Sequence, residues 1–313
     1  MFRPELKVLD CTIRDGGLMN EWRFDKAMVK DVFDGLAKAG IDYVELGYRA
    51  DKKLFSPDDF GPWRFCDEED LRDVAHECET KVAVMVDVGR TDYEAFLPAD
   101  DSIVKLFRVA TYVKDMDKAL ELGNHIKSFG YEVSVNIMAI SCAPEAELDH
   151  AIEQLAATDF DMVYLVDSFG YFTSQHIHYL AEKYLNRLPG KQIGIHTHNN
   201  QQLAFANTVE AALKGINYAD GSIYGIGRAA GNCPIELLLG FLHNPRFDVR
   251  AVFDLIEQYF IDLKKQLRWG YELPYAITGA LNKHPRAAMA FIQAGQQGSF
   301  ARFYDQLLNS EDS

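Results

Sequence analysis

Residues 7–17 read KVLDCTIRDGG, a short run of apolar and β-branched residues that ends in a charged pair and two glycines. A run such as KVLDCTI, over residues 7–13, predicts a strand that is buried on both faces. Seven further runs of this kind follow along the chain, at residues 43–47, 81–88, 102–109, 132–140, 162–167, 192–197 and 218–224. The sequence therefore predicts eight short strands.

Helical patterns separate these runs, and the clearest span residues 25–39, 115–129, 144–157, 174–188 and 202–214. Buried strands that alternate with helices are typical of a parallel α/β sheet. Eight such units predict a closed (β/α)8 TIM barrel. The alternative is an open doubly wound sheet, which usually carries a GxGxxG turn after its first strand, and no such turn follows residues 7–13.

The chain is longer than a barrel requires. It has 313 residues, whereas eight strand–helix units take about 250, and the alternation stops after Glu236. We expect a barrel domain over residues 1–245 and a short C-terminal helical appendage over residues 246–313. Two or three helices are expected within 249–269, 275–281 and 285–309, where they would cap the barrel or form a dimer surface.

Composition narrows the function. The formal net charge is −15, which disfavours binding to nucleic acid or to an anionic membrane. The five cysteines are scattered and form no CxxC, so reduced thiols in a cytoplasmic protein are expected. The N-terminus lacks the pattern of a signal peptide, and no apolar run approaches the roughly 20 residues of a membrane-spanning helix.

Chemically capable side chains stand near the ends of several predicted strands, which is where catalytic groups of a TIM barrel gather. They are Arg14 and Asp15 after the first strand, Glu45 in the second, Asp167 at the end of the sixth, His196 and His198 at the end of the seventh, and the loop GIGRAAGN, residues 225–232, after the eighth. We expect these groups to meet at one end of the barrel.

The pair His196 and His198 predicts a metal site. Side chains at positions i and i+2 of a strand point the same way, so both imidazoles can bind one ion, with Asp15 as a third ligand. An isolated HxH is as often a pair of ordinary surface or core histidines, but its place at a strand end favours the metal. Mixed nitrogen and oxygen ligands suit Mn, Mg, Co or Zn without choosing among them.

Arg14 precedes Asp15, and such a pair is most often a structural ion pair. Here Gly16 and Gly17 follow, and we expect them to let the backbone turn sharply at the strand end. Asp15 would then point at the metal and Arg14 at a substrate oxygen. A 2-oxo acid can chelate a divalent ion in this position, and the ion can then stabilise the enolate of that acid. Arg14 would stabilise the same oxyanion.

Three segments carry a resemblance to a known family. Residues 10–16 (DCTIRDG) resemble the signature DxTxRDG, residues 194–215 resemble HxHxNxxLxxAN, and residues 225–236 (GIGRAAGNCPIE) resemble GxGxxxGNxPLE. All three are motifs of the DRE-TIM metallolyases, an HMGL-like superfamily that includes 4-hydroxy-2-oxovalerate aldolase, HMG-CoA lyase and several acyl-CoA condensing synthases. The resemblance covers residues 5–240, extends more weakly to the C-terminus, and is nearest to the aldolases.

The resemblance implies roles for individual residues. Asp15, His196 and His198 match the family's metal ligands. Asn232 matches a fourth ligand of some members, and its alternative role is to hold the glycine-rich loop by hydrogen bonds.

Three further positions follow from the same motifs. Arg14 matches the arginine that steadies the enolate oxygen. Glu45 and Asp167 match acidic positions that line the pocket, where they would act directly or orient Arg14 and the metal ligands.

The departures from the family bear on the reaction. The synthases follow the RDG sequence with Glu-Gln, whereas this chain has Gly17, Leu18 and Met19. HMG-CoA lyase has a cysteine before the asparagine of its glycine-rich loop, whereas Cys233 follows Asn232. In the aldolases a histidine two residues after the RDG glycine is the expected general base, and Leu18 stands at that position.

The C-terminal region also resembles the aldolases, since residues 270–275 (GYELPY) are similar to their GYxxxY segment. By this resemblance Tyr271 and Tyr275 reach into the active site; the alternative is a buried aromatic pair that fastens the appendage to the barrel. His284 follows nearby, and it could replace the missing base if it faces the metal pocket.

The sequence thus predicts a divalent-metal-dependent aldolase or lyase that acts on a 2-oxo acid and an aldehyde. One alternative is a Claisen-type synthase that joins an acyl-CoA to a 2-oxo acid; another is a non-catalytic barrel with a binding or regulatory role. A homodimer is expected through the C-terminal helices. Some aldolases of the family pass their aldehyde to a dehydrogenase partner, for which this sequence offers no support.

Overall fold

The structure, a computed structural model, describes residues 3–295 and 299–310. Eight strands form a closed barrel in which each strand is parallel to its neighbours and the first pairs with the last. The strands are β1 (Lys7–Asp10), β2 (Tyr43–Tyr48), β3 (Lys81–Asp87), β4 (Val104–Tyr112), β5 (Glu132–Met138), β6 (Met162–Asp167), β7 (Gln192–Thr197) and β8 (Tyr218–Gly221). The predicted (β/α)8 TIM barrel is confirmed.

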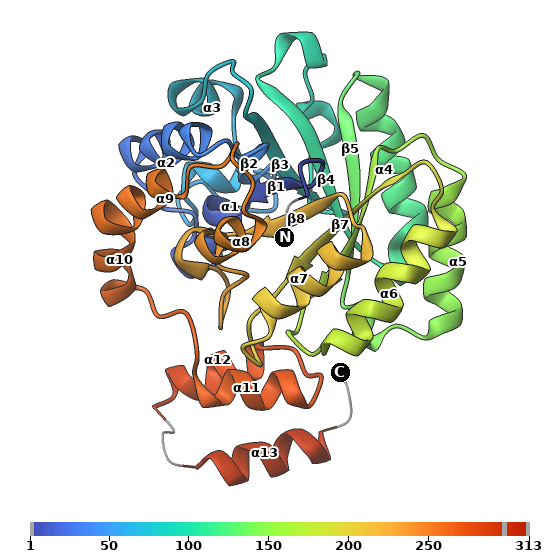
Figure 1. The fold of residues 1–313 in the computed structure, drawn as a ribbon, viewed down its shortest axis with the longest axis vertical. Helices are drawn as coiled ribbons and strands as arrows, with labels where there is room; N and C mark the ends of the chain where they lie inside the picture. The colour runs from blue at the N-terminus through green and yellow to red at the C-terminus, as the bar shows by residue number, and fades with distance from the viewer. Residues whose placement is uncertain (1–2, 296–298, 311–313) are drawn as a thin grey trace.

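Helices surround the barrel (Figure 1). They are α2 (Lys26–Lys38), α3 (Glu68–Val74), α4 (Met116–Ser128), α5 (Glu145–Ala156), α6 (Ser174–Arg187), α7 (Ala204–Lys214) and α8 (Ile235–Leu242). The five predicted helical segments each correspond to one of them, with ends that agree to within two residues. Asp25 shows why one begins where it does, because its side chain accepts a hydrogen bond from the N–H of Ala27 and caps α2.

The first strand is shorter than expected. β1 ends at Asp10, and the next residues form a short helix, α1 (Thr12–Gly16), that carries Arg14 and Asp15. Asp10 ends the strand because its carboxylate accepts hydrogen bonds from the N–H and the hydroxyl of Thr12, at 2.9 and 2.6 Å. The two charged residues therefore lie on a helical turn above the strand, where both are buried.

The expected sharp turn at Gly16 and Gly17 is also wrong, since both glycines have helical backbone angles, with φ of −62° and −60°. Gly17 serves close packing instead. A Cβ at this position would lie 2.1 Å from the ring of Trp22. The indole thus packs directly against the backbone of the turn that carries Arg14.

The other strand ends differ less. β4 continues to Tyr112, where it still pairs with β5, and β5 ends two residues earlier than expected. The strand predicted over residues 218–224 ends at Gly221. Its continuation turns away because the N–H of Ile223 donates to the hydroxyl of Thr12, at 2.8 Å.

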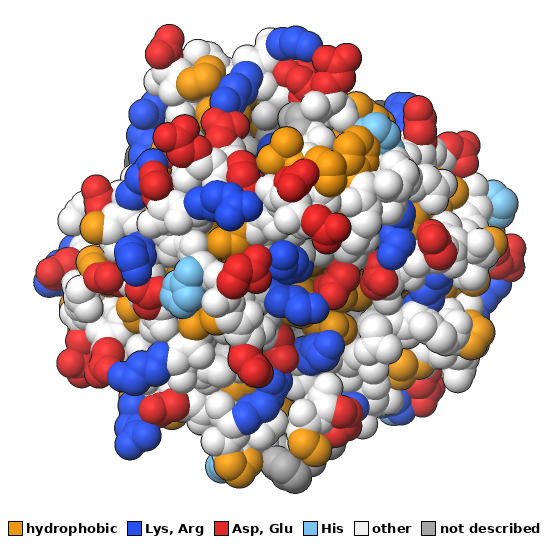
Figure 2. Space-filling model, turned by 90° about the horizontal axis from the view of Figure 1, so that it is seen from above, with side chains coloured by type: hydrophobic (Ala, Val, Ile, Leu, Met, Phe, Trp, Pro, Cys, Tyr) orange, Lys and Arg blue, Asp and Glu red, His pale blue; other side chains and the backbone are white. Residues whose placement is uncertain are grey.

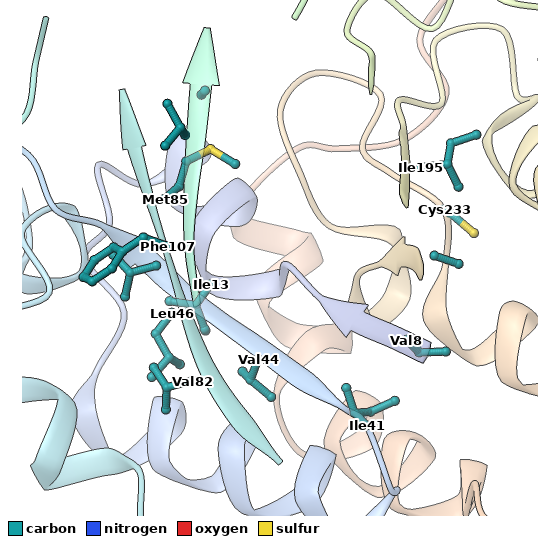
Figure 3. Packing of buried hydrophobic residues seen from close by; sticks show 14 of the residues in the cluster. Val8, Ile13, Ile41, Val44, Leu46, Val82, Met85, Phe107, Ile195 and Cys233 are labelled. Carbon is teal, nitrogen blue, oxygen red and sulfur yellow. The ribbon is translucent and has the colours of Figure 1, made fainter. Parts of the chain in front are cut away.

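Apolar residues pack on both sides of the sheet, as the period of two in a strand dictates. Val44 and Leu46 of β2 face the helices and pack near Val82 and Phe107 of the next two strands (Figure 3). A smaller cluster fills the inside of the barrel, and it includes Tyr43, Leu9, Tyr164 and Tyr218.

The C-terminal segment divides into two parts. α9 (Val249–Leu255), a π-helical turn (Ile256–Phe260) and α10 (Ile261–Gln266) contribute to the barrel's own core. By contrast, α11 (Leu273–Ala280), α12 (Arg286–Gln293) and α13 (Phe300–Asn309) form a separate cluster at one end (Figure 1). These are more helices than expected, and residues 285–309 hold two; residues 296–298 lie outside the described part.

The division into domains 1–245 and 246–313 stays a prediction, and its outermost residues 1–2 and 311–313 are not described.

On the face shown in Figure 2, acidic and basic side chains are interspersed. Among the described residues, the cysteines form no disulfide with one another. Within residues 3–295 and 299–310, every helix is too short or too polar to cross a membrane.

The barrel interior has no room for a methyl group at Gly194 of β7, because a Cβ there would lie 2.4 Å from the ring of the buried Tyr164. We expect Gly194→Ala to lower the free energy of unfolding by about 1–3 kcal/mol, as overpacking does elsewhere. Chemical denaturation measures this. Gly240→Ala is the matched control: Gly240 lies in α8 with nothing within 4 Å of its Cβ position, so that change should be neutral or stabilising.

Candidate metal centre

Three side chains that could bind a metal meet at the C-terminal ends of the strands. Asp15 comes from α1, His196 from β7, and His198 follows β7 directly. All three are buried, and one ligand atom of each lies within 4.8 Å of the others. The two imidazole rings are 5.1 Å apart and almost perpendicular. The sequence prediction that these residues meet agrees with this geometry.

The protonation states suit metal binding. Burial tends to raise the pKa of the Asp15 carboxyl, but the nearby guanidinium of Arg14 opposes it and is the main reason why that pKa lies well below its ordinary range. Burial is also the main reason why the pKa of His198 is lowered. A carboxylate and a neutral imidazole are the forms that bind metal.

His196 is held in the matching tautomer. Its Nδ1 lies 3.0 Å from a carboxylate oxygen of Asp220, which fixes the proton on Nδ1 and leaves a lone pair on Nε2. This Nε2 is buried and has no hydrogen-bond partner among the described residues. A buried acceptor without a partner is costly, so the residues present fit a divalent metal.

Asn232 lies beside the three ligands and holds the glycine-rich loop. Its Nδ2 donates to Asp15 at 2.8 Å and to the carbonyl of Ile226 at 3.1 Å. Its Oδ1 is buried without a partner in the described chain, so a role as fourth ligand stays a prediction. Gly227 allows the close approach, because a Cβ there would lie 2.4 Å from the Asp15 carboxylate.

Arg14 is fixed by two ion pairs. Its Nη1 contacts Asp15, and its Nε donates to Glu45 at 2.7 Å. Burial works against the charge, but Glu45 and Asp15 keep the pKa of Arg14 above its ordinary value. Glu45 itself is fully buried and does not line the cavity at the site. Glu45 therefore orients Arg14, which is one of the two roles that the sequence left open.

Two further charged residues complete this network, and sequence analysis missed both. Arg108 of β4 is fully buried and donates to Glu45 at 2.9 Å and to Asp220 of β8 at 2.6 Å. Its guanidinium also stacks over Tyr164, 4.3 Å from the ring centre. The sequence did hold a signal for them, because Arg108 and Asp220 are charged residues within two strands that were predicted to be buried. A buried charge needs a partner of opposite charge.

A cavity of about 80 Å³ opens beside the metal ligands. Besides Arg14 and the three ligands, its walls include Leu18, Tyr48, Asn136, Ser168, Arg228 and His284. Leu18 thus occupies the position expected for the missing general base. His284 faces the pocket, which is the condition that the sequence hypothesis set for it.

The surroundings of His284 keep its imidazole ring neutral. It packs edge-on against Phe169, with ring centres 5.3 Å apart. Burial, followed by Arg228 and Arg286, lowers the pKa of His284 to about 4. Its Nδ1 accepts a hydrogen bond from the N–H of Arg286 at 3.1 Å. The proton of the neutral ring is therefore on Nε2, so that nitrogen is a hydrogen-bond donor.

Arg228 is a third residue that sequence analysis missed, although it lies in the recognised loop, residues 225–232. Its backbone N–H donates to Asp15 at 3.2 Å, and its Nη2 donates to the carbonyl of Ser168 at 2.8 Å. The ion pairs found in residues 3–295 and 299–310 do not include its guanidinium. A cation thus lines the cavity without a carboxylate paired to it.

Three predicted residues lie outside the cavity. The carboxylate of Asp167 accepts the N–H of Tyr171 at 2.9 Å and so holds the loop after β6, while burial raises its pKa to about 7. Tyr271 is 62% exposed. Tyr275 is buried among the helices of the appendage, so it fastens the appendage. None of the three lines the cavity, so a direct part in the reaction stays a prediction for them, and Tyr275 matches the alternative role of fastening the appendage.

A (β/α)8 barrel with an Asp-His-His triad and a buried arginine at the ends of its strands defines a class of metal-dependent barrel enzymes. The comparison with known families agrees, since residues 5–258 match the HMGL-like family model. The chain belongs to the HMGL-like family.

Relatives in this family are lyases. The chain is 30% identical over 249 residues to 4-hydroxy-2-oxovalerate aldolase of Pelotomaculum thermopropionicum, covering 79% of this chain and 72% of the relative. It is 28% identical over 257 residues to oxaloacetate decarboxylase of Mycobacterium tuberculosis, covering 79% and 74%. The crystal structure of the N-terminal domain of a candidate aldolase from Bacteroides vulgatus has a TM-score of 0.76 at 29% identity, over 92% of this chain and 97% of that one. The prediction of a carbon–carbon lyase is confirmed at the level of enzyme class.

The metal site can be tested by titration with Mn²⁺ or Zn²⁺. We expect His196→Ala to abolish stoichiometric binding. Asp220→Asn should weaken it by about 10- to 100-fold, because the Asp220 carboxylate contacts Nδ1 of His196 and orients that ligand. His178→Ala, on the exposed surface of α6, is the control. Unchanged binding by folded His196→Ala protein would show that the ion binds elsewhere.

Proposed function

We propose that this protein is a divalent-metal-dependent aldolase, which cleaves or forms the C3–C4 bond of a 4-hydroxy-2-oxo acid. The observation that carries the proposal is the meeting of Asp15, His196 and His198 beside the fixed guanidinium of Arg14. The aldolase named among the relatives supports the choice of reaction. A bound divalent ion would act as a Lewis acid toward the 2-oxo acid.

Arg14 stabilises the negative oxygen that develops as the bond at C3 breaks. Two of its three nitrogens are engaged by Asp15 and Glu45, so its orientation is set before the substrate arrives. The third, Nη2, donates to none of the side chains in residues 3–295 and 299–310, and we assign it to the substrate oxygen. A donor that needs no reorientation during the reaction stabilises the transition state most effectively.

His284 acts at the other oxygen, on C4. Because the ring is neutral and carries its proton on Nε2, it polarises the aldehyde carbonyl as a hydrogen-bond donor in the condensation direction. A histidine with a lowered pKa can serve in this way without being charged. This role replaces the general base that the sequence suggested for His284.

The first test of the function needs no aldehyde. Metal-loaded protein in D₂O should exchange the methyl protons of pyruvate, which NMR follows directly, because enolate formation is common to the proposed reactions. Arg14→Met should slow exchange by about 10²- to 10³-fold while the metal content is retained. The absence of exchange by the metal-loaded wild-type protein would contradict the proposed function.

Two variants of His284 distinguish a role as hydrogen-bond donor from a role as general base. His284→Ala should lower kcat for pyruvate–aldehyde condensation by about 10²- to 10³-fold, with unchanged metal content. His284→Gln keeps a donor but cannot act as a base, so we expect it to recover a clear part of the activity. If Gln is as inactive as Ala, and both variants still exchange the methyl protons of pyruvate, a base role would be indicated instead.

Decarboxylation of a 2-oxo dicarboxylate is the second candidate, because a relative carries that name and the reaction passes through the same enolate. The two reactions are separated by their products. Release of CO₂ from oxaloacetate faster than any aldol reaction would favour decarboxylation, and release of free CoA from acetyl-CoA and pyruvate would favour a condensing synthase.

A further inference from the structure

A second, larger cavity adjoins the metal pocket. It has a volume of about 580 Å³ and lies between the barrel and the appendage. Tyr112, Phe169 and His284 line both cavities, so these three side chains form a shared wall. A ligand that reaches from the metal pocket into the outer cavity would have to pass these three side chains.

The outer cavity is cationic. Lys283 and Arg286 line it, and none of its other described lining residues is acidic. Lys283 also donates to the carbonyl of Ser310 at 3.2 Å, which holds it at the cavity. On a chain with a net charge of −15, a cavity whose described lining includes basic but no acidic side chains is a local exception. Such clefts concentrate anionic ligands.

Arg228 continues this charge on the inner side of the shared wall. It lines the metal pocket, where its guanidinium is paired with a backbone carbonyl and not with a carboxylate. Arg228 and Arg286 both contribute to lowering the pKa of His284, so both are close to that ring. The positive side chains therefore follow one path, from the metal pocket outward past His284.

We propose that this path binds a carboxylate or phosphate group at the far end of the aldehyde acceptor. The proposal rests on the proposed aldolase function and names its substrate class: an aldehyde whose carbonyl reaches the metal pocket and whose anionic end is held by Arg228 and Arg286. A small neutral aldehyde would offer neither guanidinium an anionic partner, so the binding energy of these two contacts would go unused.

The proposal is tested with matched pairs of acceptors supplied with pyruvate. Glyceraldehyde 3-phosphate is compared with glyceraldehyde, and succinic semialdehyde with butanal. The wild-type enzyme should prefer the anionic member of at least one pair in kcat/KM, and the pair that shows it distinguishes phosphate from carboxylate. No preference for either anionic aldehyde would overturn the proposal.

Variants locate the subsite. Arg286→Ala should reduce the preference for the anionic acceptor about three- to tenfold, mainly through KM, since a partly exposed charge contact is worth little more. Arg286→Lys should restore part of it. Arg302→Ala is the control, because Arg302 is an exposed arginine on α13 outside both cavities. A preference that survives in Arg286→Ala would contradict the assignment.

Exchange of pyruvate protons without any acceptor separates the two proposals. If exchange occurs but anionic and neutral aldehydes react alike, only the anion subsite is wrong. If exchange does not occur, the aldolase function fails and the subsite with it. Release of CoA from an acyl-CoA, with no reaction of the aldehydes, would assign the cationic cavity to the phosphates of CoA and overturn the proposal.

Discussion

The site depends on a chain of buried ion pairs that crosses the barrel. Arg14 contacts Asp15 and Glu45, Arg108 joins Glu45 to Asp220, and Asp220 in turn orients His196. Removing one member of such a buried pair lowers the free energy of unfolding by about 3–5 kcal/mol, because its partner is left as an unpaired charge without solvent. Three carboxylates face two guanidinium groups in this chain, and Arg228 adds a third positive charge beside Asp15. The same contacts thus fix both the metal ligands and Arg14.

The backbone around this network is shaped to bring charges close together. The turn of α1 raises Asp15 above β1, and Gly227 lets the loop after β8 approach the carboxylate to a distance at which no side chain would fit. Asn232 then holds that loop against Asp15. Loops are the variable parts of a TIM barrel, and here two of them are fixed by contacts to one ligand. This explains how a rigid site is built from segments that lie outside the strands.

The barrel and the triad could be predicted from the sequence because local patterns indicate both. Apolar runs of strand length predict the barrel, and two histidines at positions i and i+2 beside a strand end predict the triad. Sequence analysis overextended the first strand because Asp10 and Thr12 form a local bond that competes with strand pairing. It missed Arg108 and Asp220 because their partners lie far away along the chain. It expected Asp167 to line the pocket and left two roles open for Tyr275, because the direction of a side chain is decided by tertiary packing, which no single motif records.

The C-terminal appendage contributes to this site. α11, α12 and α13 share their own small cluster, which includes Ala229 and Ala230 of the loop after β8, and they present His284 to the metal pocket. In the proposed reaction, the residues that would stabilise the enolate belong to the barrel, whereas the second reactant would meet His284 and Arg286 of the appendage together with Arg228 of the barrel. A chain organised in this way can acquire a new co-substrate by changing some forty residues at its end, while the chemistry inherited with the barrel is left intact.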